Sequence, residues 1–113
     1  MATIKSYTDI EQSKKLAEIL PLESADMYYS ASNETQPTFR LHSYGHIMSN
    51  KDVCAWSLAA LLSILPDYTL QTNTDRTVFV VCESNKPMIS DTYDNPIDAC
   101  VDMIIRLNEL KML

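Results

Sequence analysis

The three cysteines and two histidines are the side chains of this sequence that could support nucleophilic catalysis. An imidazole can deprotonate a thiol, so His42 or His46 beside a cysteine would create a thiolate nucleophile. No cysteine-enzyme signature surrounds the thiols, and each lies in an apolar segment: Cys54, Cys82 and Cys100. An odd number of cysteines without a C-x-x-C pair also argues against a disulfide framework. We therefore expect reduced thiols buried in the core.

His42 and His46 have the i, i+4 spacing that places two zinc ligands on one face of a helix. Their segment begins as a predicted strand and passes through Gly45, so local geometry does not bring the two imidazoles together. Further ligands would have to come from a distant acid or cysteine. The sequence therefore predicts no metal site and no cofactor.

Three acidic residues near the start of the last predicted helix could be taken for a cation site: Asp91, Asp94 and Asp98. Their spacing lacks the alternating oxygen ligands and the turn glycine of a calcium loop. Helix capping and the positive end of the helix dipole explain Asp94 and Asp98. We expect a structural role for these aspartates.

An aromatic and partly cationic group of side chains is expected on one face of the first predicted hairpin. Period-two alternation directs four residues to that face: Tyr28, Arg40, His42 and Tyr44. Aromatic rings and arginine are enriched where proteins bind one another. Ile105, amid the acidic residues of the last helix, is a second expected contact for a partner. These five residues form the predicted partner-binding site, with a solvated sheet face as the alternative for the hairpin.

Composition excludes several classes of function. The chain has 113 residues, 46% of them apolar, with 15 acidic and 9 basic side chains and a formal net charge of -6. The scattered basic residues do not form the patch that direct nucleic-acid binding requires. A single glycine, Gly45, excludes the P-loop and the dinucleotide-binding fingerprint.

The first residues and the apolar runs predict the compartment. Residues 1–6 contain no apolar stretch typical of a secretory signal. The longest uncharged run, residues 53–66, is shorter than the ~20 residues that a membrane span requires. We therefore expect a cytoplasmic protein without a membrane partner.

Capping signals mark the first and last predicted helices. Thr8 and Glu11 form a capping box, which predicts a helix over residues 9–20. Asn95 is an N-cap followed by proline, which predicts a helix over residues 96–110.

The segments between these helices predict two hairpins and a central helix. Residues 27–31 and 38–44 form the first hairpin, joined by the polar loop 32–37. Residues 53–65 carry no charge and are predicted to form a buried helix, with Trp56 as its core anchor.

Residues 68–73 and 77–83 form the second predicted hairpin. Residues 78–82 are apolar at consecutive positions, which indicates an interior strand covered on both faces for part of its length. The element order α-β-β-α-β-β-α predicts an α+β fold over residues 1–113 as a single domain. An antiparallel sheet of about four strands would pack with three helices.

Three stretches carry a resemblance: residues 25–29 (ADMYY), residues 55–66 (AWSLAALL, ending in LP) and residues 93–99 (YDNPIDA). Together they are similar to a family of short uncharacterised proteins encoded by phages and mobile elements of gut Bacteroidetes. The resemblance covers residues 22–113. It implies a genetic context and brings no activity, cofactor or catalytic residue with it.

Three functions are compatible with these observations. The lack of a convergent catalytic set favours a non-enzymatic protein-interaction module, an accessory protein of a phage or mobile element that binds another protein or itself. An acidic inhibitor that imitates nucleic acid stays open, because the net charge permits it. A small enzyme using His42 with a cysteine or carboxylate is the third hypothesis.

Overall fold

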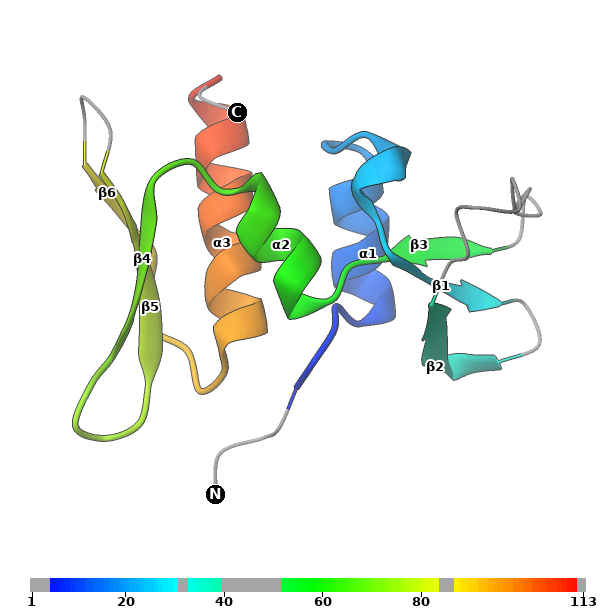
Figure 1. Ribbon diagram of the computed structural model, residues 1–113, viewed down its shortest axis with the longest axis horizontal. Helices are drawn as coiled ribbons and strands as arrows, with labels where there is room; N and C mark the ends of the chain where they lie inside the picture. The colour runs from blue at the N-terminus through cyan, green and yellow to red at the C-terminus, as the bar shows by residue number, and fades with distance from the viewer. Residues whose placement is uncertain (1–4, 31–32, 40–51, 84–86, 112–113) are drawn as a thin grey trace.

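The computed structural model describes residues 5–30, 33–39, 52–83 and 87–111. Within these ranges, three α-helices and two three-stranded antiparallel sheets follow one another, so the fold is α+β as the sequence predicts. Figure 1 shows the two sheets at opposite ends of the molecule, with the helices between them. The predicted single sheet of about four strands is wrong, because each sheet is built from strands that are close in sequence and α2 separates the two groups.

Helix α1 (Ile10–Ala17) has its capping box one residue later than predicted. Asp9 is the N-cap: its carboxylate accepts from the N–H of Gln12 at 2.8 Å, and the Gln12 side-chain oxygen accepts from the N–H of Asp9 at 3.2 Å. Thr8 is not free to cap, because its buried hydroxyl accepts from the N–H of Trp56 at 3.1 Å. A tertiary contact thus moves the cap, and the helix ends at Ala17 rather than at residue 20.

The first sheet has the order β2-β1-β3 and contains β1 (Met27–Ser30), β2 (Asn33–Phe39) and β3 (Val53–Ala55). β1 and β2 form the hairpin that the sequence predicts, with Tyr28 opposite Thr38. The predicted loop 32–37 is wrong, since most of it belongs to β2. Pro37 is compatible with this strand because β2 lies at the edge of the sheet, where not every N–H needs a partner.

Residues 53–65, predicted as one buried helix, form a strand and a shorter helix. β3 pairs with β1, and α2 (Leu58–Ile64) begins after Ser57, whose hydroxyl accepts from the N–H of Ala60 at 3.3 Å. Asp26 holds this helix start, because its carboxylate accepts from the Ser57 N–H at 2.9 Å and also from the Ser57 hydroxyl. The prediction is wrong at its N-terminal end because an uncharged run does not distinguish a buried strand from a buried helix.

Trp56 lies between β3 and α2 and is fully buried, which confirms it as a core residue outside any helix. Its indole N–H donates to the hydroxyl of Ser24 at 3.0 Å, at the end of the short 3-10 helix η1 (Leu22–Ser24). The main core around it includes Leu16 of α1 and Leu61 of α2.

The second sheet has the order β4-β5-β6 and contains β4 (Tyr68–Thr72), β5 (Val78–Cys82) and β6 (Met88–Ile89). β4 and β5 confirm the second predicted hairpin, whereas β6 is an additional strand. In the turn between β4 and β5, the Asn73 N–H donates to the Thr77 carbonyl at 2.8 Å and Arg76 has a φ of 70°. This left-handed residue lets the chain reverse over a few residues.

Helix α3 (Pro96–Glu109) confirms the last predicted helix, with the Asn95 side chain accepting from the N–H of Asp98 at 2.9 Å. The apolar residues at helical spacing along it are buried: Ile97, Cys100, Val101, Met103, Ile104 and Leu107. Leu110 is exposed because it follows the last helical turn. α3 packs on α2 and on β5 (Figure 1). We call the face of the second sheet that α3 covers its inner face.

Candidate functional site

β5 has one face in the core and the other outside it. Val78, Val80 and Cys82 are buried on the inner face, next to α3. Phe79 and Val81 project to the opposite face, are half-buried, and belong to neither core cluster of the described residues. The sequence predicts a strand covered on both faces for part of its length, but the described helices cover the inner face alone (Figure 1).

The strand register extends this second face across the sheet. Val81 pairs with Thr69 on β4 and with Ile89 on β6, and Phe79 pairs with Gln71. Because paired residues of antiparallel strands project to the same side, these five residues form one surface, which we call the outer face. Ile89 is 60% exposed, so the outer face has an apolar centre that is open to contact.

β4 is the edge strand, and the hydrogen bonds at its two ends identify which backbone groups point outward. The Asn73 N–H donates to the Thr77 carbonyl at 2.8 Å, and the Glu83 N–H donates to the Asp67 carbonyl at 2.9 Å. Because alternate residues of a strand direct both backbone groups to the same side, the odd-numbered residues of β4 bond to β5. The even-numbered residues direct their N–H and C=O groups away from the sheet: Tyr68, Leu70 and Thr72.

The outer edge of β4 lacks the features that usually prevent further strand pairing. β4 contains no charged residue and no proline, and its register with β5 has no bulge. All of its residues except Leu70 are exposed, and no described strand pairs with its outer side. Edges of this kind are templates for an additional strand, and proteins commonly block them with charges, proline or bulges. We call this edge the free edge of β4.

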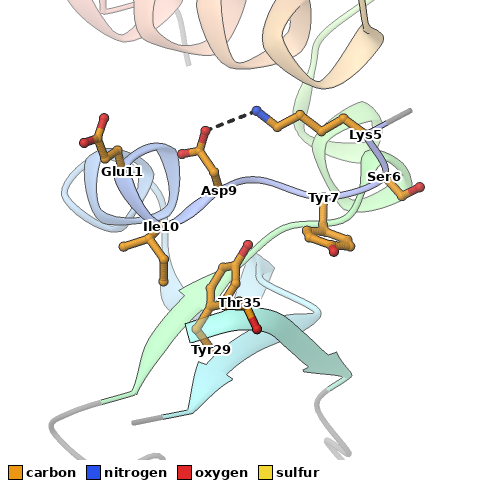
Figure 2. A pocket seen from close by; sticks show the side chains of 8 residues that line it. All are labelled: Lys5, Ser6, Tyr7, Asp9, Ile10, Glu11, Tyr29 and Thr35. Atoms are coloured by element: carbon orange, nitrogen blue, oxygen red, sulfur yellow. Dashed lines mark hydrogen bonds and ion pairs between the residues drawn. The ribbon is translucent and has the colours of Figure 1, made fainter. Parts of the chain in front are cut away.

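A groove of about 590 Å³ lies between the N-terminal segment, α1 and the first sheet, and Figure 2 shows Tyr7, Ile10 and Tyr29 along it. The Tyr29 hydroxyl donates to the Thr8 carbonyl at 2.6 Å. Burial, with smaller effects of Tyr7 and Asp9, raises the pKa of Tyr29 to about 12. Tyr29 therefore stays protonated at neutral pH, and its hydroxyl has a structural role as a hydrogen-bond donor rather than a role in acid–base chemistry.

The polar side of this groove is an ion-pair network. The Lys5 ammonium lies 2.8 Å from the Asp98 carboxylate and 3.2 Å from that of Asp9, and the Gln12 amide donates to Asp98 at 2.7 Å. Burial opposes ionisation of Asp98, but hydrogen bonds from Lys5, Asn95 and Gln12 outweigh it and lower the pKa of Asp98. Asp98 thus connects the N-terminal segment and α1 to α3.

The other two aspartates of the predicted cluster also have protein partners. Asp94 accepts from the Asn95 side chain at 2.8 Å, and Asp91 pairs with the Arg106 guanidinium at 3.0 Å. In the part of the chain that the structure describes, no three metal-binding side chains lie together, and no helix is long and apolar enough to cross a bilayer. Asp98 lies in the first turn of α3, as the sequence predicts, whereas the cap is Asn95 and Asp94 bonds the side chain of that residue.

The structure describes two of the five residues of the predicted partner-binding site. Tyr28 is half-buried in β1, in the first sheet, and Ile105 lies on α3, which packs on the second sheet. The other three, Arg40, His42 and Tyr44, lie outside the described residues, as does His46. The aromatic patch and the pairing of a histidine with a cysteine stay predictions.

Ile105 is half-buried, in contrast to the exposed contact that the sequence predicts. It packs against the main core and lines a smaller groove of about 320 Å³, together with Tyr93 and Val101. Asp98 and Asp102 of α3 line this groove together with Lys5, Asp9 and Gln12, so Ile105 lies at the bottom of a largely polar contact between α3 and the start of α1.

All three cysteines are buried and in the reduced state, with no disulfide between them, as the sequence predicts. Burial raises the pKa of Cys82; it also raises the pKa of Cys100 to about 12, with the neighbouring Cys82 adding to the effect. Both thiols stay protonated at neutral pH, so neither provides a thiolate nucleophile.

Sequence reasoning did not single out the second sheet as a candidate site. Two signals were present: the run of apolar residues at 78–82, and the uncharged strand at 68–72. The first signal indicates a strand covered on both faces for part of its length, and a sequence does not tell on which side of a strand the helices lie.

Comparison of the chain with protein-family models, with curated proteins and with solved structures finds no match. The fold and the site therefore define the class of the protein only as an α+β protein with a free edge strand beside an apolar outer face.

Proposed function

We propose that this protein is a non-enzymatic interaction module that binds a protein partner by pairing a strand of that partner with β4. The free edge carries the proposal, because Tyr68, Leu70 and Thr72 direct backbone N–H and C=O groups outward and no described strand meets them. In strand addition, such groups provide affinity and nearby side chains provide specificity. Thr69 and Gln71, exposed on the outer face of β4 itself, offer contacts to alternate side chains of the added strand.

The chemistry of the described residues supports an interaction module over an enzyme. Cys82 and Cys100 are protonated and buried, and the Tyr29 hydroxyl is bound to a backbone carbonyl. The ion pairs of Asp91 and Asp98 also argue against an acidic surface that imitates nucleic acid, since these carboxylates already have cationic partners. An accessory role in a phage or mobile element is the part of the proposal that rests on the sequence resemblance.

Leu70→Pro tests the proposal, because proline removes the outward N–H of this residue and leaves the bonds of the neighbouring residues to β5 in place. Immobilised protein is exposed to a host lysate, and captured proteins are quantified for the parent, Leu70→Pro and Leu70→Val. We expect the parent and Leu70→Val to retain a common partner and Leu70→Pro to recover at least about tenfold less of it. Loss of this one hydrogen bond leaves a carbonyl of the added strand without its donor, which costs about 1–3 kcal/mol and is enough for that decrease.

Two controls separate lost pairing from lost folding. Circular dichroism and thermal melting establish that Leu70→Pro is folded at the temperature of capture. Hydrogen exchange then compares free and bound parent protein, and the amides of Tyr68, Leu70 and Thr72 should exchange more slowly in the complex. A partner recovered equally by Leu70→Pro, or a complex without slower exchange at these amides, contradicts strand addition at β4.

A further inference from the structure

We infer that the strand added to β4 is β4 of a second copy of this chain, so that two second sheets join across a two-fold axis into one continuous sheet. This inference rests on the proposed function, because it uses the same free edge. A two-fold contact requires a surface that is complementary to itself. The free edge of β4 meets this requirement in its backbone register, its charge and its side chains.

Antiparallel pairing centred on Leu70 matches every outward backbone group of β4. Leu70 stands opposite the partner's Leu70, and Tyr68 stands opposite the partner's Thr72. Each of these pairs exchanges two N–H···O=C bonds, so no outward group of the strand is left without a partner. A shift of two residues toward the N-terminus would set Leu70 against the partner's Tyr68 and Thr72 against the partner's Pro66, which has no N–H to donate.

The lack of charged side chains on β4 favours a second copy over a charged partner. The chain has a net charge of -6, so contacts between two copies are disfavoured wherever acidic side chains face one another. β4 contains no charged residue, and in the Leu70-centred register Asp67 falls opposite the partner's Asn73. The free edge is thus a strip of the surface where two copies meet without like charges in opposition.

The side chains of β4 also fit a self-contact, and the size of the strand predicts its strength. On the inner face, half-buried Leu70 meets the partner's Leu70, and Tyr68, which is 39% exposed, is covered by the partner's Thr72. Five paired residues bury less than the roughly 800 Å² per partner of a stable interface. We therefore expect a weak dimer, with a dissociation constant in the micromolar range.

Sedimentation velocity over a range from low micromolar to millimolar protein tests the inference. Thr69 faces the partner's Gln71 across the two-fold axis, and both side chains are exposed, so substitutions there leave the core unchanged. We expect concentration-dependent dimerisation of the parent. Thr69→Glu combined with Gln71→Glu sets like charges opposite one another and should weaken the dimer at least about tenfold.

Two matched variants separate this contact from a general effect of charge. Thr69→Lys combined with Gln71→Glu sets opposite charges against one another and leaves the net charge unchanged, so the dimer should be retained or strengthened. Thr92→Glu combined with Asn108→Glu adds the same negative charge as the double glutamate variant, at exposed positions away from β4, and should retain the dimer.

The results distinguish failure of the dimer from failure of strand addition itself. A parent that stays monomeric at millimolar concentration, or a dimer that Thr69→Glu with Gln71→Glu leaves intact, overturns the second copy as the occupant. Strand addition at β4 survives either result if Leu70→Pro abolishes capture of a different protein. It fails as well if Leu70→Pro changes neither the dimer nor any captured protein.

Discussion

At the scale of single residues, Trp56 is held by parts of the chain that lie far apart in sequence. Its side chain is fully buried, and its indole N–H reaches the Ser24 hydroxyl at 3.0 Å. Its backbone carbonyl accepts from the Thr8 N–H at 3.0 Å, and its own N–H donates to the Thr8 hydroxyl at 3.1 Å. Trp56 therefore joins the segment before α1, the short helix η1 and the junction of β3 with α2.

Trp56→Ala should destabilise the protein by about 3–5 kcal/mol, because it leaves a large cavity in the main core. Ser24→Ala is the control: it removes the partner of the indole N–H, together with the bond from the Ser24 hydroxyl to the Pro21 carbonyl, leaves the indole in place and should cost about 1–2 kcal/mol. Urea unfolding followed by circular dichroism measures both free energies. A cost below about 1 kcal/mol for Trp56→Ala would show that the indole does not organise the core.

At the scale of elements, β4 has two chemically different sets of backbone groups. Thr69 and Gln71 direct their N–H and C=O groups to β5, whereas Tyr68, Leu70 and Thr72 direct theirs outward. This assignment follows from the backbone hydrogen bonds that flank β4, from Asn73 to Thr77 and from Glu83 to Asp67. Substitution by proline should distinguish the two sets, because proline removes one N–H and nothing else from the backbone bonding of a strand.

Gln71→Pro should therefore destabilise the protein by about 1–3 kcal/mol more than Leu70→Pro, since it removes a donor of the β4–β5 ladder and leaves a carbonyl of β5 without its bond. Thermal and urea unfolding of the two variants provide the comparison. Equal stability, or a larger loss for Leu70→Pro, would mean that the even-numbered residues bond to β5 and that the free edge has been assigned to the wrong residues.

At the scale of the whole molecule, Asp98 is a link between the two ends of the chain. Its carboxylate accepts hydrogen bonds from the Lys5 ammonium at 2.8 Å and from the Gln12 amide at 2.7 Å. Because Asp98 lies in the first turn of α3, these bonds join the N-terminal segment and α1 to α3. Burial works against its ionisation, but the hydrogen bonds prevail, so its pKa lies below the ordinary value of 3.8. The folded protein therefore binds a proton at Asp98 more weakly than the unfolded chain does.

This difference predicts how stability depends on pH. The stabilisation is fully present above the unfolded pKa of about 3.9 and is lost as pH falls through the lower folded value. Asp98→Asn should cost about 2 kcal/mol at pH 7, and the parent and variant should converge in acid. Asp94→Asn, at an exposed side chain without a cationic partner among the described residues, should leave the pH dependence of unfolding unchanged. A parent and an Asp98→Asn variant with parallel profiles from pH 7 to pH 2 would refute the link.

The sequence alone determined the features that depend on a few neighbouring residues. Asn95, Pro96 and the apolar period after them define α3, because a cap, a fixed φ and a 3.6-residue repeat are local properties. The two β-rich runs around the turn at Arg76 define β4 and β5 for the same reason. Burial of Trp56 and of the cysteines follows from their apolar surroundings in the sequence.

Only the tertiary structure decided the features that depend on a distant partner. The segment from Val53 to Ala55 is a strand because β1 lies beside it, and Asp9 is the cap of α1 because Trp56 occupies the hydroxyl of Thr8. The division into two sheets and the free edge of β4 have the same origin. Strand pairing joins backbone groups that every residue carries, so the side-chain pattern of a strand indicates that it pairs but does not specify which strand it meets or which of its edges stays open.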